Sequence, residues 1–410
     1  METSVPLAKG KSWKEHNRIH KEKRKKWREE RLIKKVKTEN AEEVKEEVEK
    51  LEENINNEKL NVSTISIAIP GSILDNCQSL LLRTYLAGQI ARAACIYKID
   101  EIIVFDDQGE VTEIEKNSKK KFKKDEQLGE GRAACIHLAR ILQYMECPQY
   151  LRKHFFPMHE AFEFAGALNP LDAPHHLRQQ DVSLFREGIV TNKPIKTGRG
   201  SQVNVGLFND VHIDKVLTPG LRVTVKIPPN QTNVKKLRGK VVSPNVPRQE
   251  TGIYWGYTVR LASNLTEIFT KSPYETGYDL TIGTSDKGAS IDDVSDKSLK
   301  YNHALIVFGG LAGLEAALDA DPYLKVDDPT LVFHKYLNIC PEQGSRTIRT
   351  EEAILLSLSE LRTKLIADNP AKPNLQFNNP IDTNNVNNSG MSDDCNSDED
   401  KSSRTSDDNK

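Results

Sequence analysis

The chain has 410 residues, of which 37% are hydrophobic and 29% are charged. This length exceeds one ordinary domain core, and the share of charge indicates that part of the chain is solvated tail. The 58 Lys and Arg nearly balance the 59 Asp and Glu, but they are sorted along the chain, so the balance does not exclude a nucleic-acid-binding protein. No apolar run approaches the roughly 18 residues of a membrane span, so we do not expect the chain to cross a membrane. No apolar segment follows the basic N-terminus, so we do not expect secretion.

Residues 1–60 form an N-terminal extension that is basic first and acidic later. Residues 9–37 hold fourteen Lys or Arg against four Glu, together with Trp13 and Trp27, and a Glu-rich stretch follows. Such a segment cannot bury a core, so we expect it to be disordered or to form one solvated helix. Cations interleaved with tryptophan suit RNA binding, and the run KEKRKKWREER also fits a nuclear localisation signal. The two interpretations are compatible.

The folded part is predicted to span residues 62–366 and begins with an α/β pattern over residues 62–185. Its expected elements are a strand at 64–69, a helix from Ile73 to Ala94, a strand at 101–105, a charged surface loop at 110–127 and a helix at 132–146. Short apolar runs indicate buried parallel strands, and apolar residues at helical spacing indicate a helix that faces a core. Strand, helix and strand in this order predict a β-α-β unit.

Between residues 186 and 260 the pattern changes to short strands separated by glycines. Residues 221–227 alternate apolar and polar side chains with a period of two, which is typical of a half-buried strand. About five strands in this length predict a small antiparallel barrel of the OB type, inserted into the α/β fold. The alternative is a long β-rich excursion of one large domain.

The α/β pattern returns over residues 261–366 and is followed by a tail. Its expected elements are strands at 278–283, 303–308 and 331–337 and a closing helix at 351–365, with Thr350 as its cap. Residues 367–410 are rich in Asn, Ser and Asp, and we expect a disordered acidic tail.

Three segments at predicted strand ends carry glycines, and the first and third also carry hydroxyls, as ligand loops at the carboxyl edge of an open α/β sheet do. They lie within residues 278–288, 308–315 and 336–352. The second reads G-G-x-x-G and lacks the G-x-G-x-x-G spacing of nicotinamide enzymes, which weakens an oxidoreductase as an alternative. On the first long helix, Gln89 and Arg92 share one face. Considered alone, this pattern indicates a surface salt bridge and not a functional site. Neither the histidines nor the six cysteines have the spacing of a metal site, so no metal is predicted.

Several long segments follow one another as in a known family. They are TISIAIPGSI, LAGQIARAACIYKIDEIIVFDD, residues 150–188, YDLTIGTSDKG, ALIVFGGLAGLE and YLNICPEQGSRTIRTEEAILLSL. In these segments the chain resembles the archaeal and eukaryotic SPOUT-class RNA methyltransferases that carry an inserted OB-fold domain. The resemblance covers residues 62–366. It implies a mostly parallel α/β sheet with a deep trefoil knot, a rare exception among folds, and a homodimer.

The resemblance also implies that S-adenosyl-L-methionine binds in the knot loops. The cofactor-binding residues implied are Thr284, Gly309, Gly310, Leu311, Leu337, Asn338, Ile339, Gly344, Ser345 and Thr347. Arg92, with Gln89 and Arg346, is implied at the reacting nucleotide. A guanidinium can stabilise charge that develops on the nucleotide, but it stays protonated and cannot be the base. Asp286 is one candidate base, beside water or a substrate phosphate.

The function that follows is an RNA methyltransferase that acts on ribosomal RNA, with N3 of a uridine as the target. We expect it in the nucleus or nucleolus, because of the family and the basic segment. The alternative is a catalytically silent RNA-binding or interaction protein, since vertebrate members of this subfamily are associated with the mitotic spindle and kinetochore, which would add a cytoplasmic or spindle location. The intact GGLAG and QGSRT motifs favour the enzyme.

Overall fold

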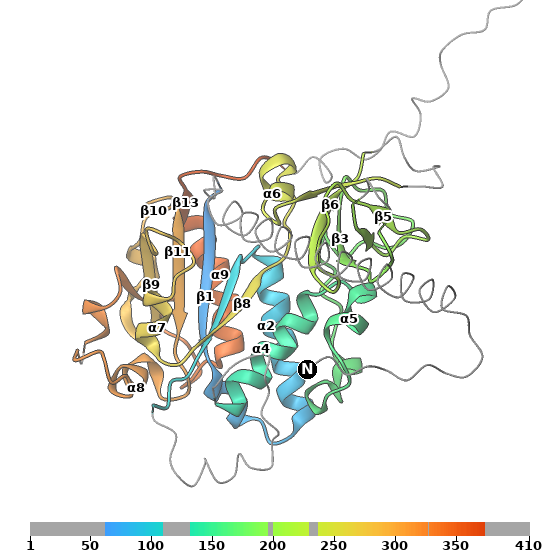
Figure 1. Ribbon diagram of the computed structural model, residues 1–410. Coiled ribbons are helices and arrows are strands. Elements are labelled where there is room, and N and C mark those ends of the chain that lie inside the picture. Colours follow the sequence, from blue (N-terminus) through green and yellow to red (C-terminus); the bar gives the residue numbers. More distant parts are fainter. Residues whose placement is uncertain (1–61, 110–131, 196–199, 229–236, 327, 374–410) are drawn as a thin grey trace, which may run out of the picture.

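A computed structural model of the chain describes residues 62–109, 132–195, 200–228, 237–326 and 328–373 (Figure 1). The predictions for the N-terminal extension, for the charged loop at 110–127 and for the tail beyond residue 373 lie outside these residues.

The larger part of the structure is a six-stranded sheet in which all neighbouring strands run parallel, in the order β12-β9-β11-β1-β2-β8. Its strands are β1 (Thr64–Pro70), β2 (Glu101–Phe105), β8 (Thr258–Ala262), β9 (Leu280–Ser290), β11 (His303–Phe308) and β12 (Lys335–Asn338). Strands β2 and β11 are buried along their whole length, which explains their continuous apolar runs. The prediction of an α/β fold with a mostly parallel sheet is confirmed.

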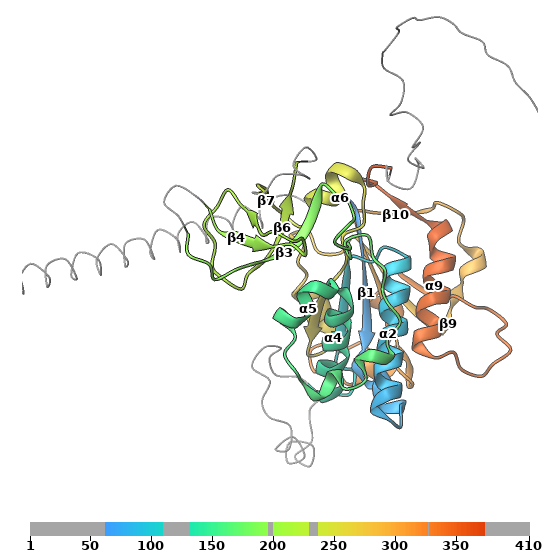
Figure 2. The same ribbon diagram turned by 90° about the vertical axis from the view of Figure 1, so that its right-hand side faces the viewer.

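Helices cover both faces of this sheet. On one face lie α2 (Leu80–Ile96), α4 (Ala133–Glu146) and α9 (Thr350–Lys364), and on the other lie α7 (Leu265–Thr270) and α8 (Gly313–Asp319) (Figures 1 and 2). Side chains alternate along a strand, so Ile67 and Ile69 pack against the first group and Ala68 against the second. The sheet is thus the middle layer of three.

Several elements differ from the sequence-based expectations. One is β9, which was expected at 278–283 and runs from Leu280 to Ser290. The helix expected from Ile73 begins only at Leu80, because a 3-10 helix, η1 (Gly71–Asn76), precedes it and Ser79 Oγ accepts the Leu82 N–H at 3.2 Å as a cap. The strand expected at 331–337 begins at Lys335, since η7 (Pro329–Leu331) takes up its start. Strand β8 at the sheet edge was not predicted, because its side chains are mostly half-buried and form no apolar run.

A second, antiparallel sheet has the strand order β5-β4-β3-β6-β7. Its strands are β3 (Phe185–Val190), β4 (Gln202–Asn204), β5 (Val211–His212), β6 (Arg222–Lys226) and β7 (Lys240–Val242). The two edges also meet: the His212 N–H donates to Leu237 O at 2.9 Å, and the Gly239 N–H donates to His212 O at 2.9 Å, in a parallel bridge. This sheet therefore closes around its own apolar core.

The remaining described elements belong to neither of these two sheets. They are α5 (Gln149–Phe155), η3 (Glu160–Phe162), η4 (Ala165–Ala167), α6 (Val246–Thr251), η6 (Ile291–Asp293), and a small parallel pair of strands, β10 (Leu299–Tyr301) and β13 (Leu365–Ala367). In the part of the chain that the structure describes, no helix has the length and apolar character needed to cross a membrane. The antiparallel sheet lies beside α5, toward the amino ends of the parallel strands, whereas α8 follows β11 at the opposite edge (Figure 1).

Candidate active site

A cavity of about 520 Å³ opens at the carboxyl edge of the parallel sheet, where β11 and β12 end and β9 continues to Ser290. Its walls come from residues 284–287 of β9, where the register against β12 shifts, from residues 308–313 and 338–350, and from η1, α2 and α9. Both its position and its volume are those of small-molecule sites in open α/β folds. The three glycine-containing segments found in the sequence are therefore brought together, although the first lies within β9 and is not a loop.

Most of the predicted cofactor-binding residues line this cavity. Those that do are Thr284, Gly309, Gly310, Leu311, Asn338, Ile339 and Thr347, together with Arg346 from the predicted catalytic group. Leu337, Gly344 and Ser345 are not among the lining residues. Leu337 is buried in the core beneath the cavity, and Ser345 is exposed, where its hydroxyl donates to Thr347 O at 2.7 Å and shapes the loop.

The glycines after β11 are required by the packing of their loop. A Cβ on Gly310 would lie 2.8 Å from Asp107 Oδ2 and 2.9 Å from Ser72 Oγ, and a Cβ on Gly309 would lie 2.9 Å from the backbone of Gly313. Thr350 Oγ1 donates to Gly309 O at 3.1 Å and ties this loop to the start of α9. Only glycine allows this close approach.

The predicted cap of the last helix is wrong. Arg349 is the N-cap of α9, and Thr350 is the first helical residue, where its hydroxyl is used by the contact with Gly309. The Glu352 carboxylate instead accepts the Arg349 N–H at 3.0 Å. Glu351 and Glu352 occupy the first turn as expected, which the helix dipole favours.

Behind the Gly310 loop lies a carboxylate that the sequence did not identify. Ser72 Oγ donates to Asp107 Oδ2 at 2.6 Å, while Asp107 Oδ1 is buried with no hydrogen-bond partner among the described residues. Burial raises the pKa of Asp107 above its usual value, although the bond from Ser72 acts in the opposite direction. This pair supports the loop from the side away from the cavity.

The cavity wall also carries charged groups that pattern analysis missed. Lys287 Nζ lies 3.0 Å from Glu315 Oε1, and Tyr336 Oη donates to the same oxygen at 3.2 Å. Burial opposes ionisation of Glu315, but a backbone hydrogen bond and the Lys287 ammonium outweigh it, so the pKa of Glu315 lies below its usual value. Glu351 is the other glutamate in the wall. These pairs join residues distant in sequence, and no local signal marks them.

The predicted catalytic pair on α2 does not reach the cavity of the same chain. Arg92 Nη1 donates to Pro170 O at 3.2 Å and to Leu171 O at 2.8 Å, and Gln89 is exposed. Neither is among the lining residues, although Leu86, about one turn earlier on α2, is. A single chain therefore brings Arg346 to the cavity and leaves Gln89 and Arg92 outside it.

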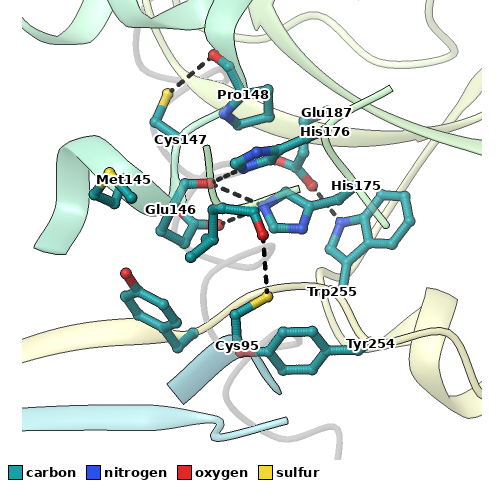
Figure 3. Close-up of polar contacts among 12 residues, drawn as sticks. Cys95, Met145, Glu146, Cys147, Pro148, His175, His176, Glu187, Tyr254 and Trp255 are labelled. Atoms are coloured by element: carbon teal, nitrogen blue, oxygen red, sulfur yellow. Dashed lines mark hydrogen bonds and ion pairs between the residues drawn. The ribbon is translucent and has the colours of Figure 1, made fainter. Parts of the chain in front are cut away.

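A second group of buried charges, the junction cluster, lies between α4 and the antiparallel sheet, and Figure 3 labels its members other than Arg222. It consists of Glu146, His175, His176, Glu187, Arg222 and Trp255. Arg222 on β6 bonds both Glu146 oxygens, at 2.7 and 2.9 Å, and Glu187 Oε2 at 2.9 Å, while Trp255 Nε1 donates to Glu187 Oε1 at 2.6 Å. These bonds fasten the antiparallel sheet to the body of the molecule.

The two histidines of the junction cluster share one acceptor. His175 Nε2 and His176 Nε2 lie 2.9 and 2.6 Å from Glu146 O, and because a carbonyl only accepts, both nitrogens must carry protons. Burial resists ionisation of Glu146, but Arg222 and His175 outweigh it and lower its pKa to about 2. Burial lowers the pKa of His176 to about 4. The cluster is thus built around an ionised Glu146 and a neutral His176.

Comparisons with known proteins place most of this structure in one family. Residues 64–361 match the model of the family described as "Putative RNA methyltransferase". The chain is 57% identical over 307 residues to the human 28S rRNA (uridine-N(3))-methyltransferase, which covers 74% of this chain and 79% of the human protein. The protein of that name from Drosophila melanogaster is 52% identical over 367 residues, covering 88% of this chain and 74% of the fly protein.

Proposed function

The chain belongs to this RNA methyltransferase family, and we propose from that premise that it methylates N3 of a uridine in 28S ribosomal RNA. The observation that carries the proposal is the identity of 52% and 57% to two proteins named for this reaction. The family match over residues 64–361 contains every wall of the cavity. A chain that kept only the fold as a scaffold would have no need for the charged and glycine-rich walls of this cavity.

We propose S-adenosylmethionine as the methyl donor, and the residues of the cavity fit it. Ile339 and Ile348 offer an apolar wall for an adenine, the Gly309–Gly310 backbone allows close approach, and carboxylates suit a sulfonium and an amino group. When bound, this donor supplies an activated methyl group, so the protein has to position the base, remove its proton and stabilise the developing charge. Arg346, which lines the cavity, is suited to the last of these tasks.

A homodimer is part of the proposal. On α2, Leu81, Leu82 and Tyr85 are 41%, 51% and 44% exposed, and on the adjacent α9 Leu355 and Leu356 are 45% and 43% exposed. Leu356 also lines the cavity, so this apolar surface is continuous with the site. A second copy on this surface would bury it and could bring Gln89 and Arg92 of one chain to the cavity of the other.

We further propose a trefoil knot and an OB-type barrel. The order β12-β9-β11-β1-β2, with residues 339–349 then leading to a helix packed on α2, supports a chain threaded through its own loop. Five short strands closed by a parallel bridge between the first and last edges support an OB-type barrel, a frequent surface for single-stranded nucleic acid. Work on ribosomal RNA implies a nuclear or nucleolar location, and association with the spindle or kinetochore stays a prediction.

The test uses the full-length protein, 28S rRNA from cells that lack it, and S-adenosylmethionine with a labelled methyl group. We expect label in N3-methyluridine after digestion of the RNA to nucleosides, and we expect binding of the donor by calorimetry. Label in another nucleoside would correct the target, and binding of RNA without any methyl transfer would leave only the interaction protein.

A further inference from the structure

This inference rests on the proposed methylation of uridine N3. That reaction needs a group that accepts the N3 proton. Arginine stays protonated, and the cavity wall contains neither histidine nor tyrosine among the described residues. Its carboxylates are Asp286, Glu315 and Glu351. The acceptor is therefore sought among these three.

Two of the three carboxylates are poorly placed for proton transfer. Glu315 is held by Lys287 and Tyr336, and its lowered pKa makes it a weaker proton acceptor. Asp286 is exposed in the second half of β9 and accepts a bond from Ser285 Oγ at 3.2 Å. Water would compete with substrate for Asp286, whereas Glu315 would first have to leave its cation.

Glu351 differs from both in its surroundings. Its side chain is only 12% exposed. A guanidinium nitrogen of Arg349, which is 71% exposed, lies 3.8 Å from Glu351 Oε1, within ion-pair range but beyond hydrogen-bond distance. No hydrogen bond to its carboxylate occurs within the described part of the chain. The Glu351 carboxylate is thus largely buried, and its Arg349 partner leaves its hydrogen-bonding capacity unused within the described residues.

Residues of η1 and α2, and Cys77 between them, also line the cavity. Cys77 lines the same cavity, and burial first, then the Glu351 charge, raises the pKa of the Cys77 thiol. Ile73 and Leu86 add apolar surface to the cavity. Glu351 therefore faces a partly apolar space in which a flat base could lie.

We propose that Glu351 is the catalytic base that takes the N3 proton of the target uridine. The N3–H bond breaks and its electron pair remains on N3. N3 forms the new bond to the methyl carbon while the carbon–sulfur bond breaks and its pair goes to sulfur. The proton goes to a Glu351 oxygen and then to solvent, so charge and atoms balance. A positioned base of this kind contributes roughly 10²–10⁴-fold to a rate.

The first experiment compares Glu351→Gln with Glu352→Gln in the full-length protein. Gln keeps the shape of Glu351 but cannot accept the proton, whereas Glu352 only caps α9 and does not line the cavity. We expect single-turnover methylation of 28S rRNA to fall about 10²–10³-fold in Glu351→Gln, with donor and RNA affinities unchanged, and to stay near wild type in Glu352→Gln. Loss of donor affinity in Glu351→Gln would assign the carboxylate to the cofactor and overturn the proposal.

A second substrate separates a missing base from a damaged site. The fluorine of 5-fluorouridine withdraws electrons and makes N3–H more acidic, so less help from a base is needed. RNA containing 5-fluorouridine should restore most of the rate of Glu351→Gln while changing the wild-type rate little. An equal defect on both RNAs would show that the substitution acts through structure, and the base assignment would be wrong.

A third measurement needs neither donor nor RNA. Mass spectrometry of Cys77 after alkylation at a series of pH values reports the pKa of its thiol. Glu351→Gln should lower that pKa, because a neighbouring negative charge is removed, and Glu352→Gln should not. An unchanged pKa would place the Glu351 carboxylate elsewhere and overturn the proposal. The wild type could also make no N3-methyluridine while the Cys77 pKa changes as expected. In that case the proposed function is wrong, although Glu351 lies near Cys77 as the structure shows.

Discussion

At the scale of single residues, Gly310 gives the sharpest expectation for the cavity. An alanine there would press its Cβ on Asp107 Oδ2 and Ser72 Oγ, at 2.8 and 2.9 Å, and push the loop into the cavity. We expect Gly310→Ala to weaken S-adenosylmethionine binding at least tenfold, roughly 1.4 kcal/mol, in a protein that still folds. Gly344→Ala is the matched control, because nothing lies within 4 Å of its added Cβ. Equal affinities in the two variants by calorimetry would contradict this expectation.

The residues of the site differ in how far sequence could predict them. The glycine-containing segments were found from composition alone, because close backbone approach needs glycine wherever it occurs. Glu315 and Asp107 were not, because their contacts with Lys287 and Ser72 arise only in the folded chain. Glu351 was not either, because its place in the cavity wall and its effect on the Cys77 thiol also depend on the fold. Arg92 illustrates the opposite case, since its helical face was predicted but its partners, the Pro170 and Leu171 carbonyls, were not.

At the scale of elements, the junction cluster decides how firmly the antiparallel sheet is held. Removing Arg222 from β6 would leave Glu146 and Glu187, whose side chains are 9% and 5% exposed, without their shared cation. We expect Arg222→Ala to lower the free energy of unfolding by about 3 kcal/mol in urea titrations. Lys226→Ala on the same strand should cost less than about 1 kcal/mol, since its pair with Glu250 is exposed. Similar losses of unfolding free energy in both variants would show that the cluster stabilises the fold no more than an exposed ion pair does.

The same cluster predicts how stability depends on pH. The pKa of His176 is lowered to about 4 in the folded chain, so between roughly pH 6.5 and 4 the unfolded chain binds more protons. Stability is then complete above that window and falls with pH inside it, by up to about 1.4 kcal/mol per unit for this group. His176→Asn should flatten the dependence between pH 7 and 5, whereas His154→Asn, an exposed position on α5, should not. Parallel curves for wild type and His176→Asn would contradict the argument.

The elements themselves were predicted where burial is uniform. Strands β1, β2 and β11 are core on both faces, so their apolar runs identify them. At the edges of the sheet the signal weakens: β8 is half-exposed, and β12 begins late because Pro329 starts a 3-10 turn. The break before α2 was missed because η1 places Ile73 and Leu74 in the core while following no α-helical spacing.

At the scale of the whole molecule, one chain alone leaves the proposed site incomplete. Arg346 and Glu351 lie in the cavity wall, but Arg92 and Gln89 lie outside it on α2, beside the exposed Leu82. If a second copy packs on this surface, each cavity would combine Glu351 of one chain with Arg92 of the other. The interpretation of Arg92 as a catalytic residue therefore depends on the dimer.

Mixing two inactive variants tests this arrangement directly. Arg92→Ala should retain its donor affinity and dimeric state yet lose methyl transfer by roughly 10²–10³-fold, as when one charge-stabilising donor is removed. When it is unfolded and refolded with Glu351→Gln, random pairing should restore about a quarter of wild-type activity, because half of the dimers are mixed and carry one intact site each. Adding Leu82→Glu to both chains should abolish the recovery by preventing the contact. No recovery from dimers shown to be mixed would mean that Arg92 and Glu351 serve the same subunit, and the shared site would have to be abandoned.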